Sequence, residues 1–175
     1  MKRLLTALAV AGIASAPVAA QTRCITTPEA EAMTLVALPD LIRQTGTVCA
    51  GRLPAASLIR DPSGRLVSRY EAEATRAWPI ARGAIVKLSD PAVDVMLDSE
   101  FARPLLTSLL VPMLVGRIAP ADCGTIDRLV TLLEPLPPRN TAGIVVATLQ
   151  YLKAEKARGG NVSVPDLPLC PAGTR

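Results

Sequence analysis

The sequence predicts an all-α protein: a single irregular bundle of six or seven short helices, stapled by two disulfides and followed by an extended C-terminal tail. Apolar residues recur at helical spacing after residue 27, and proline often opens these segments, where a helix tolerates it. The four cysteines form an even set without a Cys-x-x-Cys pair. Residues 161–175 are rich in proline and turn formers and have no regular period, which predicts the tail.

The first 20 residues have the pattern of a secretory signal peptide. A basic start at residues 1–3 precedes a short apolar run that ends in small residues at 18–20. The run is short for a membrane span of about 20 residues, and Pro17 interrupts it, which disfavours a retained anchor. We therefore expect cleavage before Gln21, a single domain over residues 21–175, no membrane span after cleavage, and a place in the periplasm or outside the cell.

Export would put the cysteines in an oxidising compartment, where disulfides form and persist. A lipid anchor on Cys24 is excluded, because residues 21–23 are polar or charged instead of small. Four cysteines allow three pairings, and sequence alone does not choose among them.

Geometry limits the pairing of Cys24. A straight helix over residues 28–48 would be about 30 Å long, whereas bridged Cα atoms lie within about 7 Å. Pro39 stands where the chain would have to bend, so we predict a helical hairpin closed by Cys24–Cys49. If the chain does not bend, Cys24 must pair elsewhere. The remaining pair, Cys123–Cys170, would tie the tail to the start of a later helix.

Two helices are expected before residue 50. Thr27 and Pro28 suit the N-cap and the first helical position of the first helix. Leu38 would lie at its end, and Pro39 would start a second helix that ends near Gly46.

A loop is expected over residues 50–64, because residues 61–64, DPSG, form a strong turn signal. A second interpretation makes residues 57–69 a small hairpin around this turn. The run from Leu66 favours a helix, because it is rich in alanine and glutamate. Pro79 would kink or restart that helix before its end at Leu88.

Residues 89–91 cap the next predicted helix, which carries Val93, Met96 and Leu97. Residues 104–116, PLLTSLLVPMLVG, contain no charge and are too few to span a bilayer. We expect them to form the central buried helix, kinked or broken at Pro112. The alternative is exposure as a membrane or partner surface.

Two further helices complete the bundle. The first covers residues 122–133 and stops at the prolines of residues 135–138. The second starts at Asn140 or Thr141 and ends near Arg158, before a glycine C-cap at residues 159–160.

Composition excludes several chemistries. The chain has no histidine, which removes the Ser-His-Asp triad, the Cys-His dyad and histidine metal sites. It has no P-loop, no G-x-G-x-x-G and no haem-attachment motif, so we expect no cofactor. Its basic residues are spread along the chain, which gives no support to nucleic-acid binding.

The candidate site residues are few. Asp90, Asp94 and Asp98 recur every four residues and form a weak candidate for a hard-cation site, although helix capping explains them better, so we predict no metal site. Glu71 and Glu73 could act as paired acids but point to different faces of a helix. The residues that could face an apolar ligand are Tyr70, Trp78, Leu109 and Met113.

These features favour an exported, non-enzymatic helical module that binds a protein or an envelope component. The first alternative is a carrier of a small apolar ligand, held against the helix of residues 104–116. The second alternative is a hydrolase that uses carboxylates alone, which needs two acids converging in one cleft.

Overall fold

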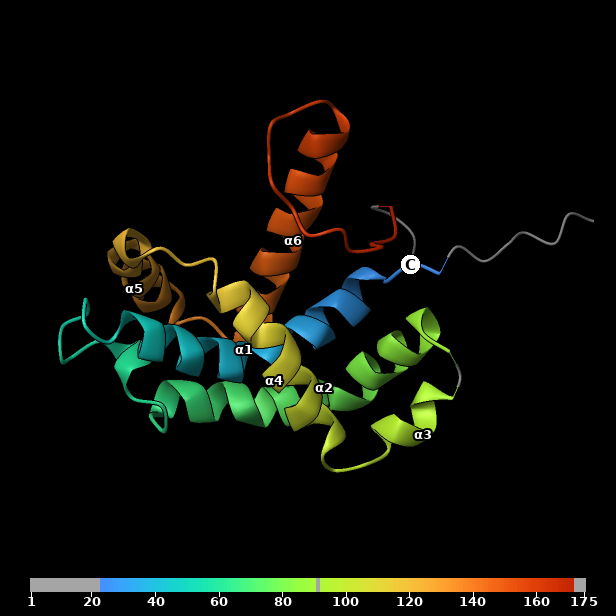
Figure 1. Ribbon diagram of the computed structural model, residues 1–175, viewed down its shortest axis with the longest axis horizontal. Coiled ribbons are helices and arrows are strands. Elements are labelled where there is room, and N and C mark those ends of the chain that lie inside the picture. The colour runs from blue at the N-terminus through green and yellow to red at the C-terminus, as the bar shows by residue number, and fades with distance from the viewer. Residues whose placement is uncertain (1–22, 91, 172–175) are drawn as a thin grey trace, which may run out of the picture.

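The computed structural model describes residues 23–90 and 92–171, so the predicted signal peptide lies outside the described residues. The predicted all-helical fold is confirmed (Figure 1). The described residues form no named strand, only a single parallel bridge between Ile25 and Leu169. The elements in order are α1 (Thr27–Cys49), η1 (Leu58–Arg60), α2 (Arg65–Leu88), α3 (Val93–Leu97), α4 (Ala102–Val115), η2 (Pro120–Asp122), α5 (Cys123–Leu133) and α6 (Pro138–Ala157).

Helix α1 is continuous, and the predicted break at Pro39 is wrong. Its N-terminus is fixed by a capping box, in which the backbone N–H of Thr26 donates to the Glu29 carboxylate over 2.7 Å. A proline inside a helix costs about 3 kcal/mol. Here Pro39 is fully buried and lies between the buried Leu35 and Ile42 on the inner side of the helix. Packing of this face against the rest of the bundle therefore outweighs the lost backbone hydrogen bond.

Helices α1 and α2 are an antiparallel pair with matched bends. Lys87 pairs with Glu29 at 2.8 Å, and Arg43 pairs with Glu71, which fixes the register along the whole length. In this register Pro79 of α2 lies within one turn of Pro39 of α1. Figure 1 shows both helices changing direction part-way along, so the two prolines bend the pair together and contact is kept on both sides.

Two of the three core clusters lie along this pair, and the third joins Ile25 and Ala30 to Val146 of α6. At one end, α1, α2 and the loop after α1 bury the large aliphatic side chains of Leu38, Ile42, Ile59 and Val67. At the other end, small residues let three helices approach closely: Ala32 from α1, Ala77 and Ala81 from α2, and Ala142 from α6. With few aromatic residues available, one cluster is filled mainly by large aliphatic side chains and the other mainly by alanines that let the helices come close.

The loop over residues 50–64 forms as predicted, and the alternative hairpin over 57–69 is wrong. Residues 58–60 form the short helix η1, and α2 begins at Arg65. Gly46 of α1 makes this loop possible, because a Cβ there would lie 1.8 Å from the carbonyl oxygen of Ile59. The loop therefore lies directly on the backbone of α1.

Two disulfides are confirmed, but the predicted pairing is wrong. The bonds are Cys24–Cys170 and Cys49–Cys123, with Cα atoms 4.9 and 5.5 Å apart. The reason is the continuity of α1, whose 23 residues hold Cys24 and Cys49 at opposite ends. Cys49 instead joins the start of α5, and Cys24 joins the tail.

Helix α6 projects from the body, and the tail returns along it (Figure 1). Gly159, at φ 89°, adopts the left-handed conformation that ends the helix. The tail then reaches the N-terminal segment, where the N–H of Ile25 donates to Pro168 O at 2.7 Å and that of Cys170 donates to Ile25 O at 2.9 Å. The predicted tail is extended through residue 171, and residues 172–175 lie outside the described part.

Candidate interaction surface

Helix α4 is exposed on most of its circumference, so its predicted place at the centre of the core is wrong. It contacts α1 along a narrow line through the buried residues Thr107, Val111 and Val115. Figure 1 shows it crossing in front of α1. The alternative of an exposed surface, which the sequence left open, is the arrangement found.

The exposed side of α4 is apolar except for Ser108, whose hydroxyl donates to the carbonyl oxygen of Leu105 at 2.8 Å. Its five large apolar side chains form what we call the α4 face: Leu105, Leu109, Leu110, Met113 and Leu114. At 100° per residue they cover about half of the helix circumference. Arg103 is the helix's one charged residue, and it donates to Thr75 Oγ1 at 3.1 Å, on α2. The α4 face is thus free of charge.

Three more exposed apolar residues precede α4: Val95, Met96 and Phe101, each at least 71% exposed. Together with the α4 face they make eight of the fifteen exposed large apolar residues of the described chain, all within residues 95–114. The eight together expose on the order of 900 Å², distributed over α3, the turn before α4 and the α4 face. This concentration is the candidate interaction surface.

The four predicted ligand-facing residues do not meet at one site. Tyr70 is buried and donates to Thr141 Oγ1 at 3.0 Å, while Trp78 packs against the alanine-rich cluster. Leu109 and Met113 lie on the α4 face, 62% and 70% exposed. The two aromatic residues therefore serve the core, and the two aliphatic ones belong to the surface.

The three aspartates are held by protein groups. Helix α3 covers only residues 93–97, too short to stack them as predicted. Arg82 of α2 binds Asp94 at 2.6 Å and Asp98 at 2.6 Å, and Asp90 accepts the N–H of Ala92 at 2.8 Å. The described residues form no cluster of three or more metal-ligating side chains. The aspartates fasten α3 to α2.

The two predicted acids also separate. Glu71 pairs with Arg43 on α1, whereas Glu73 pairs with Arg76 at 2.5 Å and with Arg139 of α6 at 3.0 Å. Glu73 and Glu31 line one hollow of about 220 Å³ between α1, α2 and α6. The hydrogen bond from Arg139 and the charges of both arginines lower the pKa of Glu73. A carboxylate held ionised in this way is a poor general acid.

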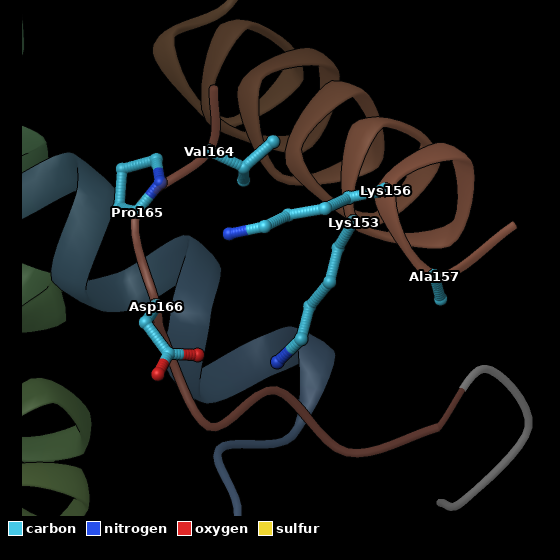
Figure 2. Close-up of a pocket in the computed structure, with 6 residues that line it drawn as sticks. All are labelled: Lys153, Lys156, Ala157, Val164, Pro165 and Asp166. Atoms are coloured by element: carbon cyan, nitrogen blue, oxygen red, sulfur yellow. The ribbon is translucent and has the colours of Figure 1, made fainter. Parts of the chain in front are cut away.

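A second hollow, of about 190 Å³, lies between α6 and the tail. Figure 2 shows the side chains of Lys153 and Lys156 pointing from α6 toward residues 164–166. Lys153 donates to the carbonyl oxygen of Leu167, which fastens the tail to the helix. Asp166 lines the same hollow, so its charges are mixed. We therefore assign this hollow to the attachment of the tail to α6.

The sequence pointed to Leu109 and Met113 but missed Val95, Met96 and Phe101. A helix that is apolar all round usually indicates burial, and this rule assigned α4 to the core. The exposed trio stands among the acids Asp94, Asp98 and Glu100. Charged residues on both sides of apolar ones were the signal that this segment faces water.

Comparison with protein-family models, with curated proteins and with solved structures finds no match. Within the described residues, no single helix has the length and hydropathy needed to cross a membrane. Helices α4 and η2–α5 meet that test only as a pair, with a bend of 92° between them.

Proposed function

We propose that this protein is an exported, non-enzymatic interaction module of the periplasm, and that residues 95–114 form its binding surface. The observation that carries this proposal is the α4 face with its three neighbours Val95, Met96 and Phe101, an apolar surface free of charge on α4 itself. Keeping this surface in water is unfavourable, at about 25 cal/mol per Å², so a partner that covers it gains affinity.

The disulfides support the proposed compartment. Both bonds join segments that are far apart in the sequence, and such bonds persist in an oxidising environment. The signal-like composition of residues 1–20 supports export to the periplasm.

The two alternatives have less support. Neither of the two hollows described above is lined by α4, so no observation favours an apolar ligand held there. A carboxylate hydrolase would need one acid kept protonated near neutral pH, whereas the pKa of Glu73 is lowered.

A photo-crosslinking amino acid at position 109 tests the proposal in the intact envelope of the host. The matched control places it at position 151, because Tyr151 of α6 is as exposed as Leu109, at 62%. We expect adducts with a macromolecule from position 109 and none from position 151. Equal labelling from both positions, or none from either, would remove residues 95–114 as the binding surface.

A further inference from the structure

We infer that the occupant of the α4 face is a second copy of this chain, bound antiparallel about a two-fold axis near Leu109. The inference rests on the proposed function, since it names the partner of the same surface. An isologous dimer buries the same patch on both copies, so a patch fit for it must be large enough and must not repel itself.

The size of the surface suits a dimer. A standard interface buries about 800 Å² per partner. The eight exposed apolar residues between Val95 and Leu114 expose on the order of 900 Å² in total, and the part beside Leu109 would form the apolar centre of such an interface. The α4 face alone has no charge to leave unpaired when it is buried.

One ridge of the α4 face is symmetric about Leu109. Leu105, Leu109 and Met113 are spaced four residues apart and form one ridge along the helix. In an antiparallel pair centred on Leu109, each Leu105 meets the Met113 of the other copy, and the two Leu109 side chains meet each other. Side chains of similar size therefore face one another along the whole ridge.

Charges at the two ends select the antiparallel orientation. Glu100 precedes α4 and Arg117 follows it; both are exposed, and neither side chain has a hydrogen bond or ion pair with a described residue. They are 17 residues apart, about 25 Å along a helix, and Leu109 lies near their midpoint. Antiparallel packing brings each Glu100 to the end of α4 that carries the other copy's Arg117. Parallel packing would instead bring like charges together.

The same charges disfavour an anionic bilayer as the occupant. Residues 90–122 carry five acids and two arginines. Surfaces that bind anionic lipid carry an excess of lysine and arginine beside the apolar face. Asp94 and Asp98 are paired with Arg82, but the segment still has no excess of basic residues to bind lipid phosphate, whereas a second copy offers each Glu100 an arginine.

Sedimentation velocity of the exported, oxidised protein between about 1 and 200 µM tests the inference. We expect a reversible dimer, and Leu109→Asp should weaken it at least about tenfold, because it places two carboxylates at the axis. Tyr151→Asp is the matched control and should leave the dimer unchanged. Circular dichroism should show native helix content for both variants, because both positions are exposed.

Charge reversal tests the orientation. Glu100→Arg alone should weaken the dimer by about fivefold, and the double variant Glu100→Arg/Arg117→Glu should return it to within about twofold of the native value. A single variant that weakens the dimer without rescue by the double variant would overturn the antiparallel arrangement.

The remaining outcomes separate this inference from the proposed function. A protein that stays monomeric at 200 µM, or a dimer that Leu109→Asp leaves intact, overturns the second copy as occupant. If position 109 still crosslinks to another macromolecule in the envelope, the binding surface stands and its partner differs. Flotation of the native protein, but not of Leu109→Asp, with phosphatidylglycerol vesicles would assign the face to a bilayer instead.

Discussion

At the scale of single residues, contacts across helices determine roles that the residue types alone leave open. Arg82 binds Asp94 and Asp98 and so connects α3 to α2. Arg139 and Arg76 bind Glu73, the candidate acid, and favour its ionised form. Arg82 and Arg139 lie on other elements than the acids they bind, so no local pattern indicates these pairs, whereas Arg76 follows Glu73 by three residues on the same helix. The sequence therefore identified these aspartates and Glu73 as noteworthy residues, but it did not predict that they form ion pairs between elements.

Gly46 offers a sharp test at this scale. Gly46→Ala would place a methyl group 1.8 Å from the Ile59 carbonyl oxygen, so the loop around η1 must move. We expect a loss of at least about 3 kcal/mol in the free energy of unfolding, measured by urea denaturation. The control is Gly83→Ala in α2, where the added methyl meets nothing within 4 Å and should stabilise by about 0.5–1 kcal/mol. Equal effects would contradict the close approach of loop and helix.

The ion pairs of Glu73 should make the folded protein less stable as the pH falls. Its pKa is lowered below the ordinary 4.5 by the hydrogen bond from Arg139 and the charge of both arginines. A lowered folded-state pKa contributes stability that is full above the unfolded pKa and is lost as the pH falls through the folded value. Glu73→Gln should therefore be less stable than the parent at pH 7 and lose less stability between about pH 5.5 and pH 3. Thermal unfolding across this range measures the difference, and Arg139→Gln should shrink the same step.

At the scale of elements, helix existence was readable from the sequence, but helix continuity and burial were not. Prolines mark the starts of α1, η2 and α6, although the N-cap of α1 is Thr26, one residue before the predicted Thr27. Helix α2 was predicted with its internal Pro79. The same residue type misled at Pro39, because burial against the rest of the bundle keeps α1 intact. The burial of α4 was misjudged because apolar character measures the preference for leaving water, not the presence of a neighbour to cover the helix.

A pair of substitutions in α4 checks which side of the helix faces the protein. Val111→Ala removes methyl groups from a fully buried position and should cost about 1–2 kcal/mol. Leu109→Ala removes a larger side chain from an exposed position and should change monomer stability by less than about 0.5 kcal/mol. Both are measured by urea denaturation at low protein concentration, where association does not contribute. A large cost at position 109 would show that α4 is buried after all.

At the scale of the whole molecule, two disulfides, one enclosed in sequence by the other, connect distant parts of the helical bundle. Cys49–Cys123 closes 74 residues within the 146 closed by Cys24–Cys170. The inner bond fixes α5, of which Cys123 is the only buried residue, to the end of α1. The outer bond fixes both chain ends to each other, beside the Ile25–Leu169 bridge.

Nesting predicts that the two bonds do not contribute additively. Each alone would stabilise by about 4–5 kcal/mol in the chain-entropy treatment. Because the inner bond already shortens the outer loop, each bond contributes less when the other is present, so replacing both cysteine pairs by alanine should cost more than the sum of the two separate losses. Urea denaturation of the three variants measures this, and strict additivity would contradict the nested arrangement.

Loss of Cys24–Cys170 alone should raise the rate of amide hydrogen exchange in residues 161–171.

The order of the cysteines also has a consequence for how the protein matures. A chain emerges from its site of synthesis N-terminus first, so Cys24 and Cys49 meet an oxidant before Cys123 and Cys170 do. The bond that forms earliest by this order is the one that the finished α1 forbids. If a Cys24–Cys49 bond closes first, a later thiolate must attack it and release one of these cysteines before both native bonds can form. Acid trapping during oxidative refolding should capture that species, and thiol–disulfide isomerase should speed its disappearance. Because the native bonds join the first cysteine to the last and the second to the third, neither can close until the second half of the chain is present.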